Sequence, residues 1–214
     1  GEVIKTKKGE LSIKVNQSTI LSKSLRSFPE KWHGLKDKET RFRQRYLDLI
    51  VNPESKKILE TRSKVIKLIR EYLHENSFVE VETPILQTKA GGAIAKPFTT
   101  HHNALGLDMY LRIAPELYLK RLIIGGFEKV FELGKIFRNE GIEQTHLPEF
   151  TMLESYQAYV DANSVMDMVE DMCTYVFKNL ETDTKLHFGE NTADFSGPWK
   201  RISMFDMVSE KLNI

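Results

Sequence analysis

The chain has 214 residues, of which 41% are hydrophobic and 29% are charged, a balance that suits a folded protein with a buried core and excludes a wholly disordered chain. Its 31 Lys and Arg and 30 Asp and Glu leave a net charge of +1. Cys173 is the only cysteine, which excludes an intramolecular disulfide and favours a reducing compartment such as the cytoplasm. No apolar run is long enough to span a bilayer, so we expect no membrane partner.

The charges are unevenly distributed along the chain. Residues 1–75 hold 18 basic and 10 acidic side chains, whereas residues 76–214 hold 13 basic and 20 acidic ones. This asymmetry suggests a front region that faces a polyanion and a back region that holds a cation. Chance patterning on two solvated surfaces is the alternative explanation.

Residues 1–28 have the pattern of short β-strands. Apolar stretches at 3–6 and 11–15 flank the sequence Lys7-Lys8-Gly9-Glu10, which predicts a hairpin turn, and residues 18–25 are a candidate third strand. Two or three strands cannot close a barrel. We therefore interpret this segment as the last part of a β domain.

Residues 29–52 are interpreted as a linker. They are rich in charge and contain Pro29, Trp32 and Gly34. Their last part, residues 41–50 (RFRQRYLDLI), is strongly basic with interleaved apolar residues. The basic side chains within residues 36–45 form a cluster of the kind that can bind phosphate groups without sequence preference.

A long helix is predicted next. Asn52 is a favourable N-cap, Pro53 suits the first helical position, and the helix should end near Asn76-Ser77. One apolar stripe runs along it, formed by Ile58, Val65, Ile69 and Leu73.

Alternating strands and helices are expected after residue 77. Apolar and β-branched runs predict strands, and the glycines and prolines between them predict the boundaries. The expected elements are strands at 78–83 and 107–112, a helix from Pro115-Glu116 to Gly125-Gly126, a helix at 164–180, and a weak strand followed by the start of a helix within 185–214.

The most informative segment is a pair of predicted strands at 130–139 and 150–159. Side chains on a strand alternate between its two faces, so Arg138 shares a face with Ile136 and Glu140. On the partner strand Phe150, Met152, Glu154 and Tyr156 share a face. One surface of the sheet would then carry an Arg, two Glu, a Tyr and a Phe.

A polar face of this kind has two explanations. Buried charges are unfavourable unless they are paired or bind a ligand, which favours a binding site. A solvated face with ion pairs that only stabilise the fold is the alternative. The sequence contains no Walker loop, no GxGxxG, no nucleophile elbow and no metal-ligand spacing, and we expect structural or surface roles for His101, His102 and Cys173.

The motifs together resemble those of the class II lysyl-tRNA synthetases. Residues 41–50 are similar to that family's junction between anticodon-binding and catalytic domains, and residues 78–86 (FVEVETPIL) resemble class II motif 1. Residues 137–140 (FRNE), followed by His146 and by residues 148–154 (PEFTMLE), resemble motif 2. Residues 110–120 (YLRIAPELYLK) are similar to the lysine-specific enzymes in particular.

The resemblance implies an α+β fold. Residues 1–28 would be the C-terminal part of an OB-fold β-barrel that binds the anticodon, and 29–52 would be the linker. Residues 53–214 would be the N-terminal part of a class II catalytic domain, an antiparallel sheet flanked by helices. Motif 1 would form a homodimer interface.

The implied reaction is activation of L-lysine by ATP and transfer of the lysyl group to tRNA(Lys). In such a reaction positioning and charge stabilisation dominate. Arg138 would be the catalytic residue, because a guanidinium can hold both the α-phosphate and the lysine carboxylate. Phe150 would stack on adenine, His146 would contact the outer phosphates, and Glu140 would meet the adenine amino group or the terminal tRNA adenosine.

The resemblance also assigns the amino-acid pocket. Lysine carries two ammonium groups, so its pocket requires carboxylates. Glu116 would bind the α-ammonium beside a backbone contact near Gly92, and Glu154 and Tyr156 would bind the ε-ammonium. The related aspartate enzymes need basic residues in this place, so Glu154 argues against that specificity.

Several departures from the family pattern are present. Ser77 stands where Gly is common, and Thr145 and Leu147 flank His146 where Arg and Asn are common. The ATP-binding motif 3 and the late acidic residues that hold Mg²⁺ are not found, so we expect these 214 residues to be part of a longer enzyme and to activate lysine poorly alone. The alternatives are a naturally short, non-catalytic paralogue that binds RNA or a protein partner, an elongation-factor lysylating enzyme, and another class IIb synthetase.

Overall fold

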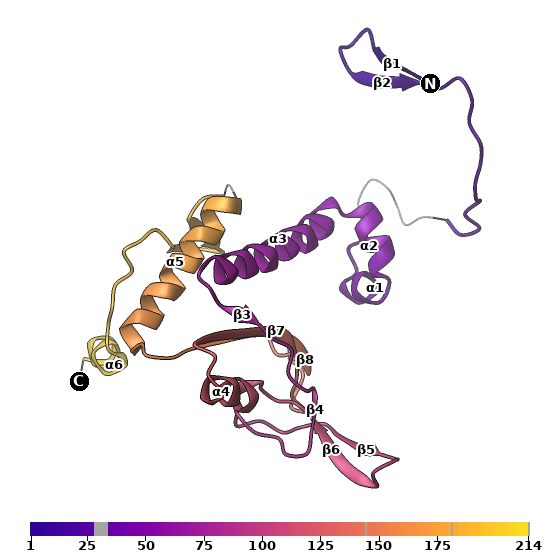
Figure 1. The fold of residues 1–214 in the computed structure, drawn as a ribbon. Coiled ribbons are helices and arrows are strands. Elements are labelled where there is room, and N and C mark those ends of the chain that lie inside the picture. Colours follow the sequence, from indigo (N-terminus) through magenta and orange to yellow (C-terminus); the bar gives the residue numbers. More distant parts are fainter. Residues whose placement is uncertain (28–33, 144, 181, 214) are drawn as a thin grey trace. The chain divides into compact units, whose positions relative to one another are not determined.

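A computed structural model describes residues 1–27, 34–143, 145–180 and 182–213 (Figure 1). The predicted boundary between residues 28 and 29, and the first part of the predicted linker, lie outside these residues. The chain divides into two compact units, Gly1–Glu60 and Thr61–Ile214, which are considered separately. Among the described residues, no helix is long and apolar enough to cross a membrane.

The first unit begins with the predicted hairpin. Strands β1 (Glu2–Lys5) and β2 (Leu11–Lys14) pair antiparallel with Glu2 opposite Lys14, and the turn is closed by a hydrogen bond from the Gly9 N–H to the Thr6 carbonyl (2.8 Å). The third strand predicted at 18–25 is wrong. An extended segment becomes a strand only when a neighbouring strand completes its hydrogen bonds, and no strand of the described chain pairs with these residues. The described residues form no closed barrel, and the assignment of residues 1–28 to an OB-fold stays a prediction.

Residues 38–51 are helical, where the sequence was interpreted as a linker. Helix α1 (Lys38–Arg43) begins after Asp37, whose carboxylate accepts a hydrogen bond from the Thr40 N–H (2.7 Å). Helix α2 (Arg45–Val51) follows directly. The high charge of this segment obscured the helices, because most of its charged side chains stay on the surface.

A fully buried carboxylate connects the two short helices. Asp48 accepts hydrogen bonds from Arg41 Nε (2.7 Å), Asn52 Nδ2 (2.7 Å) and Arg45 Nη1 (2.6 Å). The hydrogen bond from Asn52, with those from the arginines, lowers the pKa of Asp48 although burial alone would raise it. Two of the basic residues of this tract are therefore used within the unit.

Helix α3 (Pro53–Glu75) matches the predicted helix closely. It ends where Ser77 takes a positive φ of 66°. The chain then enters β3 (Val79–Glu80), which pairs in parallel with β7 (Lys129–Phe137). Only two residues of the predicted strand at 78–83 join the sheet, and this parallel pair is an exception to the expected antiparallel pattern.

The sheet is completed by β8 (Glu149–Gln157), which pairs antiparallel with β7 over nine residue pairs, from Lys129 opposite Gln157 to Phe137 opposite Glu149. A second sheet has the order β4–β6–β5. Its strands are β4 (Leu86–Gln87), β5 (Thr99–His102) and β6 (Leu107–Leu111). Helix α4 (Glu116–Ile124) follows β6 and contacts both β7 and β8.

The core lies on one face of the β7–β8 pair. Phe131 is fully buried there and packs with Leu73, also fully buried, and with Phe78. Helix α5 (Ala162–Leu180) packs against the same cluster. Figure 1 shows the end of α3 and α5 on one side of this sheet and α4 on the other. The remaining residues around the core are Ile69, Tyr72, Leu133, Leu153, Met168, Met172 and Tyr175.

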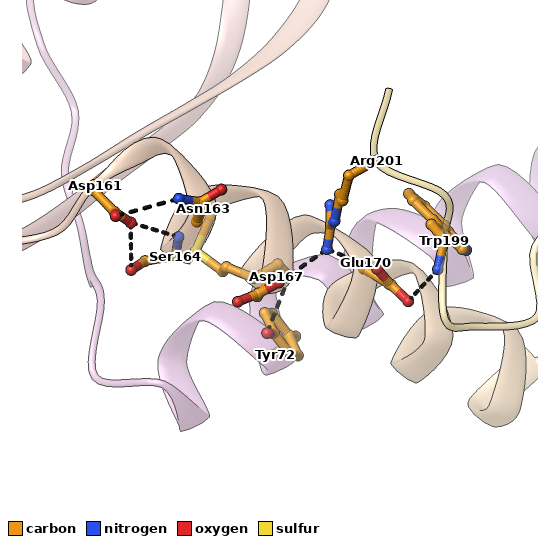
Figure 2. Close-up of polar contacts among 9 residues, drawn as sticks. Tyr72, Asp161, Asn163, Ser164, Asp167, Glu170, Trp199 and Arg201 are labelled. Carbon is orange, nitrogen blue, oxygen red and sulfur yellow. Dashed lines mark hydrogen bonds and ion pairs between the residues drawn. The ribbon is translucent and has the colours of Figure 1, made fainter. Parts of the chain in front are cut away.

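Polar contacts tie the last part of the chain to α5, as Figure 2 shows. Arg201 pairs with Asp167 (2.9 Å) and Glu170 (2.8 Å), and the Trp199 N–H donates to Glu170 (2.8 Å). Asp161 caps α5 by accepting from the Ser164 N–H (2.9 Å). The segment comprises a hairpin of β9 (Lys185–Phe188) and β10 (Asn191–Asp194) and the helix α6 (Met204–Leu212).

Replacement of Phe131 by alanine should strongly destabilise the Thr61–Ile214 unit. The side chain is fully buried, so the variant loses apolar burial and leaves a cavity, and we expect the free energy of unfolding to fall by about 3–5 kcal/mol. Chemical denaturation of the native protein measures this change. Phe127→Ala is the matched control, because Phe127 is 43% exposed and its loss should cost less than about 1 kcal/mol. Equal losses would contradict the assignment of the core.

Candidate functional site

The face of the β7–β8 pair opposite the core carries the predicted polar residues. The register places Ile136 opposite Phe150 and Glu132 opposite Glu154, and alternation puts Tyr156 on the same face. Just beyond β7, the Arg138 N–H still bonds to the Pro148 carbonyl (2.9 Å). The interpretation that one surface carries an arginine, glutamates, a tyrosine and a phenylalanine is confirmed for Arg138, Phe150, Glu154 and Tyr156.

Arg138 and Phe150 form one end of this face. The guanidinium carbon of Arg138 lies 5.3 Å from the centre of the Phe150 ring, within the range of a cation–π contact, and Arg138 Nε donates to the Ile113 carbonyl (3.4 Å). Both side chains line a cavity of about 710 Å³. Its other lining residues come from the loop between the strands, Glu140, Gly141, Ile142, Glu143, Thr145, His146 and Leu147.

Two predicted nucleotide-binding residues lie in this cavity wall. The His146 ring pairs with the Glu143 carboxylate and contacts Thr145 Oγ1 (3.0 Å) through Nδ1. The Glu140 carboxylate accepts a hydrogen bond from the Lys96 N–H (3.3 Å), which brings the loop around residue 96 to the cavity. The side chains of Arg138, Glu140 and Phe150 thus line a space large enough for a nucleotide.

Glu154 and Tyr156 form the other end of the face. The Tyr156 hydroxyl donates to Glu154 Oε2 (3.0 Å), and no other hydrogen bond or ion pair to this carboxylate is found in the described part of the chain. Burial raises the pKa of Glu154, and the nearby Glu116 and Glu132 raise it further, although the Tyr156 hydrogen bond and Arg138 oppose them. Burial and Glu154 together raise the pKa of Tyr156 well above its ordinary value. Among the described residues, this half-buried carboxylate forms no ion pair.

Gly92 lies directly against Glu116 at the start of α4. A Cβ on Gly92 would be 2.9 Å from the Glu116 Cβ and 3.1 Å from the Ala114 Cβ, and Gly92 has a φ of +87°, so both space and backbone conformation favour glycine. Glu116 pairs with Lys120 one turn along the helix (2.7 Å). The structure therefore brings Gly92 and Glu116 together, in agreement with the proximity that the family resemblance implies, and Glu116 acts electrostatically on Glu154.

A buried ion pair that was not predicted from the sequence lies beneath this site. Arg112 is 2% exposed and Glu132 is 4% exposed, and they pair with each other. Glu132 also accepts from the Thr83 hydroxyl (2.6 Å). A Cβ on Gly134 would overlap the Arg112 guanidinium. The glycine opposite Met152 in an otherwise bulky strand was the available signal, because it marks a close approach of another group.

Other candidate residues have ordinary roles. His101 pairs with Asp108 (2.7 Å) across the β5–β6 hairpin, and His102 Nδ1 accepts from the Leu105 N–H (3.3 Å). Cys173 lies half-buried on α5, and burial raises the pKa of its thiol. No group of three or more His, Cys, Asp or Glu residues that could hold a metal occurs in the described ranges.

Comparison with known proteins agrees with this geometry. A family profile described as "tRNA synthetases class II (D, K and N)" matches residues 37–213. The chain belongs to this family of class II tRNA synthetases. The match covers both three-stranded sheets of the second unit and every residue of the candidate site.

Individual class II synthetases are similar over the whole chain. The lysine–tRNA ligase of Thermoanaerobacter sp. strain X514 is 55% identical over 214 residues, that of Prochlorococcus marinus subsp. pastoris is 56% identical over 214, and that of Clostridium perfringens strain SM101 is 56% identical over 210. These alignments cover 100%, 100% and 98% of this chain but 43%, 42% and 42% of the relatives. The chain thus spans about two fifths of the length of these ligases.

Glu154→Gln should stabilise the ligand-free protein at pH 8. Because the folded state raises the pKa of Glu154, ionisation above that pKa opposes folding, and the unfavourable contribution disappears as the pH falls toward the ordinary glutamate value of about 4.3. We expect a higher melting temperature for the variant at pH 8 and a shrinking difference at lower pH, measured by thermal unfolding. Glu149→Gln on the same strand is the control, because Glu149 is 53% exposed and pairs with Lys135 at the surface. A destabilised Glu154→Gln variant at pH 8 would contradict the argument.

Proposed function

We propose that the native protein is a lysine–tRNA ligase, which activates L-lysine with ATP and transfers the lysyl group to tRNA(Lys). The observation that carries this proposal is the Glu154 carboxylate, which lies on the same sheet face as Arg138. Its hydrogen-bond partner is the neutral Tyr156 hydroxyl, and burial and neighbouring carboxylates raise its pKa. A cation bound between Glu154 and Glu116 would offset the repulsion between them. The lysine–tRNA ligase names of relatives 55–56% identical support the same substrate.

Each end of lysine has a matching group in this proposal. Glu116, beside the backbone of Gly92, binds the α-ammonium, and Glu154 with Tyr156 binds the ε-ammonium. Arg138 holds the lysine carboxylate together with the α-phosphate of ATP. Two carboxylates and one guanidinium therefore match two ammonium groups and one carboxylate, which favours lysine over an acidic amino acid.

The nucleotide is assigned to the cavity at the other end of the face. Phe150 stacks on adenine, His146 contacts the outer phosphates, and Glu140 meets the adenine amino group or the terminal adenosine of tRNA. A lysine carboxylate oxygen attacks the α-phosphorus and pyrophosphate leaves. A hydroxyl of the terminal adenosine then attacks the carbonyl carbon of lysyl-adenylate and AMP leaves. Arg138 stabilises the negative charge that develops at the α-phosphate.

Further parts of the proposal concern groups outside this face. Mg²⁺ accompanies ATP in such reactions, but the described residues do not provide a site that fits it, so we assign it neither ligands nor a step. The segment 78–86 is proposed to form a homodimer interface, and the enzyme is proposed to act in the cytoplasm.

A non-catalytic protein that binds RNA through residues 36–45 is the second candidate. The structure offers it less support than the sequence did. Arg41 and Arg45 pair with the buried Asp48, and Arg43 pairs with Glu39 (2.5 Å), so fewer cations are left for phosphate groups. Lysine-dependent exchange of pyrophosphate into ATP by the native protein distinguishes the two candidates, because only a synthetase catalyses it.

Glu154→Gln should weaken lysine binding without weakening ATP binding. The variant loses one charge-assisted contact, worth about 1–3 kcal/mol, while the nucleotide cavity is unchanged. Titration calorimetry with each ligand separately measures both affinities, and at low pH the wild-type affinity for lysine should fall toward that of the variant. An unchanged lysine dissociation constant would refute the role of Glu154.

Gly92→Ala should reduce lysine affinity by at least about tenfold, because the added methyl group displaces Glu116. Gly126→Ala is a matched control, since Gly126 also has a positive φ (+104°) but a Cβ there would meet nothing within 4 Å. Both variants carry the same kind of backbone strain. Equal lysine affinity in the two variants, measured by calorimetry, would show that Gly92 has no role in the pocket.

A further inference from the structure

The buried pair of Arg112 and Glu132 is hydrogen-bonded to Lys135 on β7 and to Thr83 in the segment that follows β3. Arg112 Nε donates to the Lys135 carbonyl (2.9 Å), and Nη1 donates to the Thr83 carbonyl (3.1 Å) and to Glu132. Glu132 in turn accepts from the Thr83 hydroxyl and from the Thr83 N–H (3.2 Å). One guanidinium and one carboxylate thereby connect β7 to the chain that leaves β3.

The same pair is linked to both carboxylates assigned to lysine, to Glu116 through the chain and to Glu154 through the register of the sheet. Arg112 stands four residues before Glu116, and its backbone N–H and carbonyl are held by Ile85 (2.9 Å) and Phe137 (3.1 Å). Glu132 lies directly opposite Glu154 in the β7–β8 register. The ion pair therefore joins the segment that carries Glu116 to the point of the sheet that carries Glu154.

We propose that Arg112 and Glu132 are positioning residues that set the separation between Glu116 and Glu154. This separation selects the length of the diamino acid that binds. This inference rests on the proposed lysine ligase function. A pocket with two fixed carboxylates fits an amino acid whose two ammonium groups match their separation. A homologue one methylene shorter, ornithine, then reaches only one of them well.

The geometry of Arg112 explains why an arginine is needed. Its planar fork makes hydrogen bonds in several directions, whereas a lysine offers one compact ammonium group on a flexible stem. Gly134 leaves the space that the guanidinium fills. With lysine at position 112 the charge remains, but the bonds to Thr83 and Lys135 cannot all be kept.

The test is pyrophosphate exchange by the native protein with lysine and with ornithine. One methylene is worth about 10–200-fold in discrimination, so we expect Arg112→Lys to lower the lysine-to-ornithine ratio of kcat/KM by about tenfold. The loss should appear mainly in KM for lysine, with KM for ATP changed less than about twofold. Arg70→Lys is the control, because Arg70 also pairs with a glutamate, Glu80 (2.9 Å), away from the site, and its ratio should stay at the wild-type value.

A second variant distinguishes a loss of discrimination from a folding defect in Arg112→Lys. The double substitution of Arg112→Met with Glu132→Leu replaces the ion pair by an apolar pair, a change that often preserves stability. It should fold and still lose discrimination, because the bonds to Thr83 and Lys135 are gone. An unchanged ratio in a folded variant, or equal losses for both amino acids, would overturn the inference. A wild-type protein without lysine-dependent exchange would instead overturn the proposed function.

Discussion

Side chains along β7 and β8 alternate between two environments, and the register of this one antiparallel pair decides which environment each side chain meets. With Glu132 opposite Glu154, the residues flanking them in sequence, Phe131, Leu133 and Leu153, point into the core beneath α3 and α5. A slip by one residue would exchange the two sets. The packing of apolar residues on one face therefore also fixes the positions of the charged groups on the other.

The charged groups on this face are neutralised to different degrees, and the most deeply buried of them have the most hydrogen bonds. Glu132 and Arg112 are almost completely buried, which is tolerable because each is hydrogen-bonded in several directions. Arg138 is held by a carbonyl and an aromatic ring. Glu154 has only the Tyr156 hydroxyl among its described neighbours. The face thus combines a buried ion pair that has several hydrogen bonds with a half-buried carboxylate that has fewer.

Much of this arrangement could be predicted from the sequence because it depends on local periodicity. The limits of α3, the two long strands and the shared face of Arg138, Phe150, Glu154 and Tyr156 follow from alternation and capping alone. The resemblance to class II synthetases added the proposed roles of Gly92 and Glu116, whose contact no local pattern indicates.

The errors came from interactions between residues far apart in the sequence. The two helices within residues 38–51 were not predicted because the charge density there is high, but Asp48 is buried against Arg41 on the neighbouring helix and Arg45 on its own helix. The Arg112–Glu132 pair spans 20 residues, so no window of local sequence contains it as a motif. Residues 18–25 have strand propensity, but a strand also requires a partner that propensity does not supply.

The number of donors around a carboxylate separates Asp48 and Glu132, which stabilise the fold, from Glu154, which we propose binds a ligand. Asp48 accepts from Arg41, Asn52 and Arg45, and its pKa is lowered. Glu132 likewise accepts from a guanidinium, a hydroxyl and an amide. A cation placed beside Asp48 or Glu132 would find the lone pairs of that carboxylate already occupied by these donors.

Glu154 presents the opposite case. Among the described residues it has one neutral donor, the Tyr156 hydroxyl, and its pKa is raised by burial and by neighbouring carboxylates. Ionising it in the empty site is unfavourable, and an ammonium group offers both the charge and the hydrogen bonds that are missing. Of the carboxylates of Asp48, Glu132 and Glu154, that of Glu154 is the one that the described residues neutralise least, which is the physical reason for proposing that the lysine side chain binds there.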